Sequence, residues 1–208
     1  MRTRIKFCGM TNVEDAIFAA ELGVDAIGLI FVPDSSRLVT VSKARIIIQA
    51  LPAWVSTVVV VANQSAEEIK NLITALPFDM LQFHGDESPE FCQQFNKPYI
   101  KAIRMHEDIN ALSLIEQYHT ANGFLLDNYS ADTLGGTGKT FDWKKVPAIV
   151  SQPIILAGGL TPVNVTQAIK QVHPYGVDVV SGIESRPDCK DHTKMRHFIT
   201  EVKNAERT

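Results

Sequence analysis

The sequence has few of the features that are typical of secreted disulfide-rich, nucleic-acid-binding or membrane proteins. Its 208 residues include only three cysteines, Cys8, Cys92 and Cys189. That number is too small for the disulfide framework of a cysteine-stabilised secreted domain. We therefore predict free thiols in a reducing compartment and a cytoplasmic location.

Excess charge of one sign and long apolar runs are also missing. The formal net charge is −3, so no strongly basic face is implied, and we predict no nucleic-acid partner. The most apolar stretch, Val55–Ala62, is far shorter than the roughly 20 residues that span a bilayer, so we predict no membrane association. The basic start of the chain is soon interrupted by Glu14 and Asp15, which argues against a secretory signal.

What the sequence does contain is a regular alternation of two patterns. Short runs rich in β-branched and aromatic residues predict strands over Arg4–Cys8, Ala26–Phe31, Trp54–Val61, Met80–Phe83, Tyr99–Ile103, Gly123–Leu126, Ile154–Ala157 and Val177–Val180. Between them, amphipathic segments predict helices over Val13–Leu22, Ser42–Ala50, Ala66–Leu76, Pro89–Phe95, Ile109–Tyr118, Val163–Gln171 and Lys190–Lys203, with a weak one beginning near Asp142.

This alternation predicts the fold class. Strands that strictly alternate with helices form parallel sheets with helical crossovers. About eight such units in roughly 200 residues fit an α/β fold of the eight-stranded parallel (β/α)8 TIM-barrel type. We predict one such barrel over residues 1–208 as a single catalytic domain. A flavodoxin-like open sheet is the second choice, because it needs only about five units.

Glycines follow the last two predicted strands. Gly158 and Gly159 end the seventh strand, and Ser181 and Gly182 end the eighth, where a short helix near Ser181 is expected. Barrels often bind phosphate at these two loops through backbone N–H groups, and glycine lets a ligand approach closely. Tight turns are the alternative explanation. A third glycine run, 135–139, lacks the GxxxxGK[ST] spacing of a nucleotide-binding P-loop.

A thiol and a carboxyl group occupy the catalytic register of two other strands. Cys8 ends the first strand and Asp127 closes the sixth. These strands are three places apart in a ring of eight, so their ends face each other across the mouth. The two side chains form a plausible acid–base pair. Cys8 is equally explained as a small buried residue, and Asp127 as a loop cap.

Further polar residues occupy matching positions. Arg37 follows the second strand, and its guanidinium suits a carboxylate. His84 ends the fourth strand and is a candidate for substrate contact. Arg104, on the fifth strand, is expected to line the pocket or pair with a loop acid. Asp178 is expected either to contact substrate or to pair with Lys6 inside the barrel.

Taken in order, these segments resemble one family. They are KFCGMT (6–11), SSR (35–37), QFHGDE (82–87), KAIR (101–104), LLD (125–127) with GGTGKTFDW (135–143), ILAGGLTPVNV (155–165) and GVDVVSGIES (176–185). Together they resemble phosphoribosylanthranilate isomerase of tryptophan biosynthesis, over almost the whole chain. Each segment alone carries little information, but all of them in order, each at a predicted strand end, are highly specific.

The resemblance implies an activity and residue roles. The activity is the Amadori rearrangement of N-(5-phosphoribosyl)anthranilate to 1-(2-carboxyphenylamino)-1-deoxyribulose 5-phosphate. By resemblance, Asp127 is the general acid and Cys8 the general base. Arg37 matches the residue that contacts the anthranilate carboxylate, and the glycine-bearing loops match the phosphate site. No metal or cofactor is expected, and both a monomer and a homodimer are compatible with the family.

Two positions depart from the family pattern. Val180 stands where the family more often has a serine, and this could remove one hydroxyl near the phosphate. Asp188 stands after a proline where glycine is more usual, in a loop before the last helix. Neither position touches the proposed acid or base, so activity is expected to survive.

Three competing functions can be weighed against these residues. A related aminoaldose isomerase of histidine biosynthesis would carry an aspartate where Cys8 stands. Indole-glycerol-phosphate synthase relies on lysine chemistry and a longer N-terminus. A catalytically silent phosphosugar-binding barrel would keep the glycine loops and lose the acid or the base, and both Cys8 and Asp127 are present.

Overall fold

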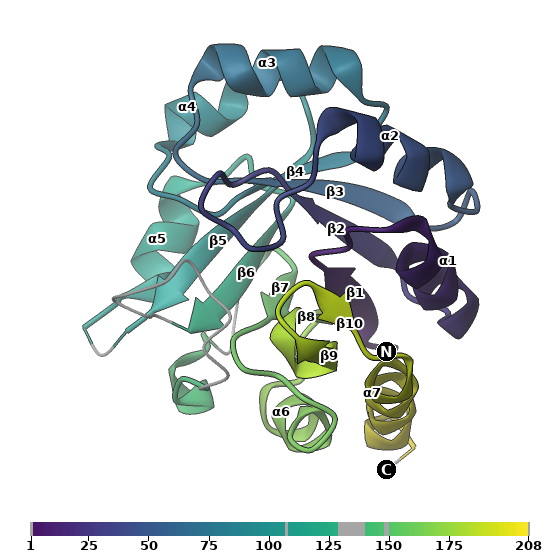
Figure 1. Ribbon diagram of the computed structural model, residues 1–208. Coiled ribbons are helices and arrows are strands. Elements are labelled where there is room, and N and C mark those ends of the chain that lie inside the picture. The colour runs from purple at the N-terminus through teal and green to yellow at the C-terminus, as the bar shows by residue number, and fades with distance from the viewer. Residues whose placement is uncertain (1, 107, 129–139, 148–149, 208) are drawn as a thin grey trace.

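The strands close into a parallel barrel with helices on its outside. A computed structural model describes residues 2–106, 108–128, 140–147 and 150–207. Figure 1 shows the ring of strands and the helices around it. The eight barrel strands are β1 (Arg4–Cys8), β2 (Ala26–Ile30), β3 (Ser56–Val61), β4 (Met80–Phe83), β5 (Tyr99–Met105), β6 (Gly123–Asn128), β7 (Ile154–Leu156) and β8 (Gly176–Val179). They lie in sequence order, and pairing of β1 with β8 closes the ring, as predicted.

The outer layer is helical. Its helices are α1 (Val13–Leu22), α2 (Val41–Ala50), α3 (Ala66–Ala75), α4 (Pro89–Gln93), α5 (Ala111–Gln117), α6 (Val165–Val172) and α7 (His192–Ala205). Two 3-10 turns, η1 (Trp143–Lys145) and η2 (Ser181–Ile183), follow β6 and β8, and a small hairpin joins β9 (Glu184–Arg186) to β10 (Cys189–Lys190). α7 packs against both α1 and α6, which brings the end of the chain beside its beginning (Figure 1).

Strand alternation divides the core into two parts. Successive side chains of a strand point to opposite faces. Inside the barrel, Ile100, Ala102, Leu125 and Ala157 form a small apolar cluster. A much larger core lies between the strands and the helices. Burial of each large apolar side chain contributes about 1.5–3 kcal/mol, so the outer layer supplies most of the hydrophobic stabilisation.

Local sequence fixes the ends of the helices. Asn12 caps α1 by accepting a hydrogen bond from the Asp15 amide, and Gly23 ends it in the left-handed conformation at φ +89°. α3 begins with a complete capping box between Ser65 and Glu68. These signals explain why the predicted bounds of α1 are exact and those of α3 differ by one residue.

Several predicted bounds were wrong by a few residues. β3 begins at Ser56 rather than Trp54, and Trp54 is 95% exposed. β5 and β6 run on to Met105 and Asn128, because Arg104 and Asp127 continue the strand pairing. The last helix begins at His192 rather than Lys190. Tertiary contacts hold Lys190 in the β9–β10 hairpin, and Asp191 caps the helix.

The remaining bounds differ by one or two residues: α4 ends at Gln93 rather than Phe95, α5 begins at Ala111 rather than Ile109, and α6 begins at Val165 rather than Val163. The strands predicted to end at Phe31, Ala157 and Val180 each end one residue earlier, and β8 begins at Gly176. In the described part of the chain, no helix is long and apolar enough to cross a membrane.

Candidate active site

Cys8 lies at the carboxyl end of β1 and points into the barrel. It shares that face with Lys6, because Phe7 between them packs outward against Phe198 of α7. Cys8 is paired with Gly28 on β2. A Cβ atom on Gly28 would lie 2.4 Å from the Cys8 sulfur, so glycine is required here to make room for the thiol.

A buried ion pair stands beside the thiol. Lys6 donates to Asp178 of β8 at 2.8 Å, with both side chains about 95% buried. The predicted contact between these two residues is therefore present. Burial raises the pKa of the Cys8 thiol, while the Lys6 ammonium acts in the opposite direction. The positive charge near Cys8 thus comes mainly from Lys6, with a smaller contribution from Lys190.

Asp127 ends β6 and faces a histidine. Its Oδ2 lies 3.2 Å from His84 Nε2, and its Oδ1 accepts the Asn128 amide at 2.7 Å. On the other side of the imidazole, Gln82 Nε2 lies 2.9 Å from His84 Nδ1. Gln82 and His84 are two residues apart at the end of β4, so they share one face, and together they lead to Asp127. β1 and β6 are three places apart in the closed ring, so Cys8 and Asp127 end strands on different sides of the mouth.

Arg37 is held at the mouth by an acid from the last barrel loop. Its Nε and Nη2 donate to the two carboxylate oxygens of Glu184 at 2.8 and 2.6 Å. Glu184 also accepts from Lys190 at 2.9 Å, and Lys190 donates to the Cys8 carbonyl at 2.8 Å. Arg37 is therefore not a solvated loop residue, and this network connects its loop to the strand that carries Cys8.

Backbone geometry at the ends of β7 and β8 requires glycine. Gly158 and Gly159 have φ of +79° and +67°, in the left-handed region. A Cβ on Gly182 would lie 1.9 Å from the Leu160 carbonyl oxygen, so the two loops approach closely there. Ser181 begins the expected short helix, which is η2. The glycine run 135–139 lies outside the described residues.

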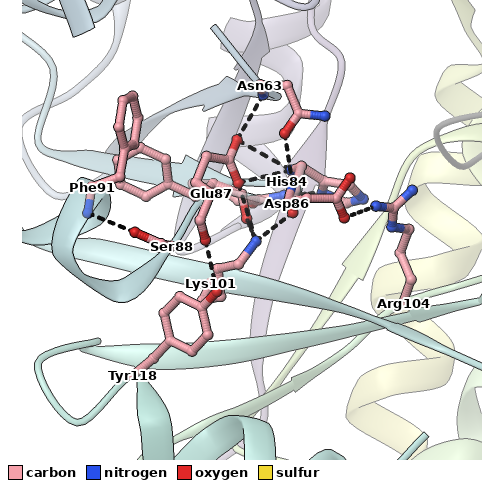
Figure 2. Close-up of polar contacts among 12 residues, drawn as sticks. Asn63, His84, Asp86, Glu87, Ser88, Phe91, Lys101, Arg104 and Tyr118 are labelled. Carbon is pink, nitrogen blue, oxygen red and sulfur yellow. Dashed lines mark hydrogen bonds and ion pairs between the residues drawn. The ribbon is translucent and has the colours of Figure 1, made fainter. Parts of the chain in front are cut away.

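A second lysine holds the β4–α4 loop that carries His84. Lys101 points outward from β5 and donates to the Gly85 carbonyl at 2.6 Å and to Glu87 at 3.1 Å. Glu87 also accepts the amides of Asn63 and Gly85, and Tyr118 donates to the Glu87 carbonyl at 2.6 Å. Figure 2 shows these side chains converging on the loop. Lys101 and Tyr118 both donate to backbone carbonyls of this loop, so the cluster fixes its conformation.

Arg104 pairs with Asp86 on the same loop, in accordance with one of its two expected roles (Figure 2). Asp86 is largely exposed, unlike the buried groups behind it. Within the described ranges, no group of three or more His, Cys, Asp or Glu side chains could hold a metal ion.

Comparisons with known proteins identify the family. Residues 5–201 match the family model described as N-(5'-phosphoribosyl)anthranilate isomerase. Proteins of that name from Legionella pneumophila (strain Paris) and Pseudomonas fluorescens (strain SBW25) are each 50% identical to this chain. The alignments cover 97% of this chain and 97% and 96% of those proteins.

The chain belongs to the N-(5'-phosphoribosyl)anthranilate isomerase family.

Solved structures of the family share this barrel. The phosphoribosylanthranilate isomerase of Thermotoga maritima is 35% identical, with a TM-score of 0.89 over 97% of this chain and 99% of that one. A family structure solved in complex with reduced 1-(o-carboxyphenylamino)-1-deoxyribulose 5-phosphate is 33% identical, with a TM-score of 0.83 over 97% of this chain and 99% of that one. The predicted fold and the predicted isomerase function in tryptophan biosynthesis are confirmed.

The structure describes the surroundings of Val180 and the backbone conformation of Asp188, the two departures from the family pattern. Val180 follows β8, and its side chain lies close to Gly9, whose added Cβ would be 3.3 Å from Val180 Cγ1. Asp188 adopts φ +65°, a conformation that favours glycine and that aspartate tolerates better than most residues. The usual glycine of the family at this position therefore has a conformational reason.

Sequence reasoning missed several residues that build the site. Gly28 lies inside a strand, where nothing in the sequence reveals that it faces the Cys8 sulfur. Glu184 and Lys190 flank the predicted phosphate loop, but their contacts with Arg37 and Cys8 come from distant parts of the chain. The local sequence around Glu184 and Lys190 does not indicate either contact.

Proposed function

We propose that this isomerase uses Asp127 as its general acid and Cys8 as its general base. The observation that carries the proposal is the position of the two groups. Each ends a strand at the mouth of one barrel, and each has charged or N–H partners suited to its task. Carboxyl ends of barrel strands are where catalytic residues sit.

The chemistry divides into two proton transfers. Asp127 gives its proton to the furanose ring oxygen, the bond from C1 to that oxygen breaks, and the anthranilate nitrogen forms a Schiff base with C1. Cys8 then removes the proton from C2, and the released electron pair forms the C1–C2 double bond of an enolamine. Tautomerisation of the enolamine gives the ketone product, so the sequence of steps is redox-neutral overall.

The surroundings of Asp127 suit the loss of a proton. The carboxylate left behind accepts the Asn128 amide, and His84 Nε2 lies 3.2 Å from its Oδ2. Such hydrogen bonds strengthen as negative charge develops, which lowers the barrier of the step. His84 therefore belongs to the proposed site through Asp127, in addition to the substrate contact predicted from the sequence.

Lys6 supports Cys8 as a base. Burial raises the pKa of the thiol, and a nearby ammonium stabilises the thiolate that must form. Asp178 holds the ammonium in place at 2.8 Å. Asp178 is also retained from the sequence as a proposed substrate contact, because it shares the inward face of β8.

Arg37 is proposed to bind the anthranilate carboxylate. Its pair with Glu184 uses Nε and Nη2, and Nη1 lies on the other edge of the guanidinium. We expect Arg37→Ala to raise KM for the natural substrate about tenfold or more and to leave the affinity for phosphate analogues without a carboxylate unchanged. Equal weakening of both ligands would contradict the assignment.

The phosphate is proposed to bind at Gly158, Gly159, Ser181 and Gly182. Support comes from the left-handed glycines after β7 and the turn η2 after β8, at the two loops where barrels hold phosphate. The relative solved with reduced 1-(o-carboxyphenylamino)-1-deoxyribulose 5-phosphate binds a ligand of the same class.

The same proposal includes expectations about the domain, its location, its partners and its oligomeric state. Residues 1–208 act as one cytoplasmic domain on a small phosphorylated substrate, without nucleic-acid or membrane partners. The chain is a monomer or a homodimer, and one structure from Thermotoga maritima concerns monomers generated from a dimeric isomerase. Sedimentation of the purified protein distinguishes the two states.

The acid and base roles are tested by replacing each group. Cys8→Ala and Asp127→Asn are each expected to reduce kcat by about 10²–10⁴-fold or more, while the protein stays folded and binds a product analogue. The assay follows the loss of anthranilate-type fluorescence after freshly made substrate is added. Cys92→Ala is the matched control, because Cys92 is an equally buried thiol that faces the outer core. Normal turnover in either active-site variant refutes the role of that residue.

A further inference from the structure

Gln82 is a buried amide inside the barrel, at the end of β4. It is 1% exposed, and its Nε2 lies 2.9 Å from His84 Nδ1. His84 in turn faces Asp127 Oδ2 through its Nε2, at 3.2 Å. The three side chains therefore form an uninterrupted chain from an amide through an imidazole to a carboxyl group.

The direction of these contacts fixes the imidazole hydrogen. An amide nitrogen can only donate, so Nδ1 of His84 accepts from Gln82. In a neutral ring the hydrogen must then be on Nε2, the nitrogen that faces Asp127 Oδ2 at 3.2 Å. Each carboxyl oxygen has two lone pairs, so Asp127 can hold a proton for the substrate while its Oδ2 remains able to accept a hydrogen bond from Nε2.

Gln82 has one further notable feature, its unpartnered oxygen. Among the described residues, Oε1 of Gln82 is one of the few buried side-chain atoms without a hydrogen-bond partner. An unsatisfied buried acceptor is unfavourable, and an apolar side chain would fill this space without that penalty. Packing therefore does not explain the amide, whereas its contact with His84 does.

We propose that Gln82 is a positioning residue that acts through His84 on Asp127, an inference that rests on the proposed role of Asp127 as the acid. By keeping the hydrogen of His84 on Nε2, Gln82 directs an N–H donor at the carboxylate that forms when Asp127 releases its proton. The bond is strongest in the transition state, so the effect falls on kcat rather than on substrate binding.

The first test replaces the amide with an apolar group of similar size. In Gln82→Met, we expect His84 to lose its single tautomer, kcat to fall about tenfold, and KM to stay within about threefold. ¹⁵N NMR of the neutral imidazole reports the tautomer directly. The chain has six histidines, so the spectrum of His84→Asn identifies the signals of His84 by their loss.

Gln64 provides a matched control. Like Gln82, it is a glutamine whose buried Oε1 has no partner among the described atoms, and its Nε2 donates to the Phe31 carbonyl rather than to a histidine. Gln64→Met is expected to leave the His84 signals unchanged. A shift of those signals in the control as large as in Gln82→Met would overturn the inference, because the tautomer would then not depend on Gln82.

A second variant covers the case in which Gln82→Met does not fold. Gln82→Glu keeps the size, but an ionised carboxylate can only accept, so the hydrogen of the neutral ring moves from Nε2 to Nδ1 and kcat is again expected to fall about tenfold. An unchanged tautomer, or a changed tautomer with unchanged kcat, overturns the inference. Failure of the proposed function is distinct, because it appears as turnover by Asp127→Asn, whereas the tautomer of His84 is measured without any turnover.

Discussion

The barrel contains two buried lysine–carboxylate pairs, one inside the ring of strands and the other outside it. Lys6 and Asp178 meet at 2.8 Å inside the barrel, next to the Cys8 thiol. Lys101 and Glu87 meet at 3.1 Å outside it, under the helical layer and next to Tyr118. In both pairs the side chains are at least 94% buried.

Their partners differ, and so do their functions. Lys101 donates to the carbonyls of Phe83 and Gly85 as well as to Glu87, so all its hydrogen bonds hold one loop. The Lys6 ammonium interacts with Asp178 and with the Cys8 thiol, which is the proposed base. We therefore propose that the same chemical pair is a loop clamp on one face and an electrostatic support for the base on the other. Strand alternation alone decides which role each lysine has.

The strongest test of this comparison is Lys6→Met. We expect kcat/KM at neutral pH to fall about 10²–10³-fold, because loss of the ammonium removes the main effect that opposes burial and raises the pKa of Cys8 further. Since the base must be deprotonated, part of the loss should be recovered as the pH rises. The pH profile of kcat/KM measures this effect. If the loss does not depend on pH, Lys6 does not act through the pKa of the Cys8 thiol.

Lys101→Met should reduce the stability of the protein more than its activity. Removal of one partner from a buried pair leaves Glu87 uncompensated and destabilises the protein by about 3–5 kcal/mol. Below its unfolding temperature the variant should keep kcat/KM within about tenfold of the parent. Urea unfolding and steady-state kinetics provide both values. If activity falls as far as in Lys6→Met, the two pairs do not have separate roles.

The smallest effect is expected at the rim. Arg104 pairs with Asp86 on the loop that Lys101 clamps, but Asp86 is 75% exposed. Solvent screens such a pair, so Arg104→Ala should reduce the free energy of unfolding by no more than about 1 kcal/mol. Unfolding at low and high salt checks this, since added salt should reduce the difference. A loss comparable with that of Lys101→Met would mean that burial does not distinguish the two contacts.

Most of the barrel could be predicted because its signals are local. Alternating apolar runs, the Asn12 cap and the Ser65 box are read from neighbouring residues, and they locate the elements to within a few positions. Errors arose where distant contacts decide a boundary. Lys190 has a helical pattern after it, yet its bonds to Glu184 and the Cys8 carbonyl hold it in a hairpin.

The candidate site was predictable in part. Cys8, Asp127 and the glycines could be selected because their positions at strand ends follow from the order of the elements. His84 could also be selected, but its contact with Asp127 could not. The partners of Cys8 could not be selected, since Gly28 meets it through strand register and Lys190 reaches it from the β9–β10 hairpin. Residue types and strand order indicated the candidate catalytic residues, but only tertiary contacts showed their hydrogen-bond and ion-pair partners.

By itself, the sequence determined the barrel, the strands whose ends carry chemistry, and the family resemblance. It could do so because periodicity, helix caps and motif order are properties of short segments. Only the tertiary structure decided which charges surround Cys8, that Glu184 holds Arg37, and that Gln82 reaches Asp127 through His84. These depend on strand register and closure of the ring, which bring residues far apart in the chain to within hydrogen-bonding distance.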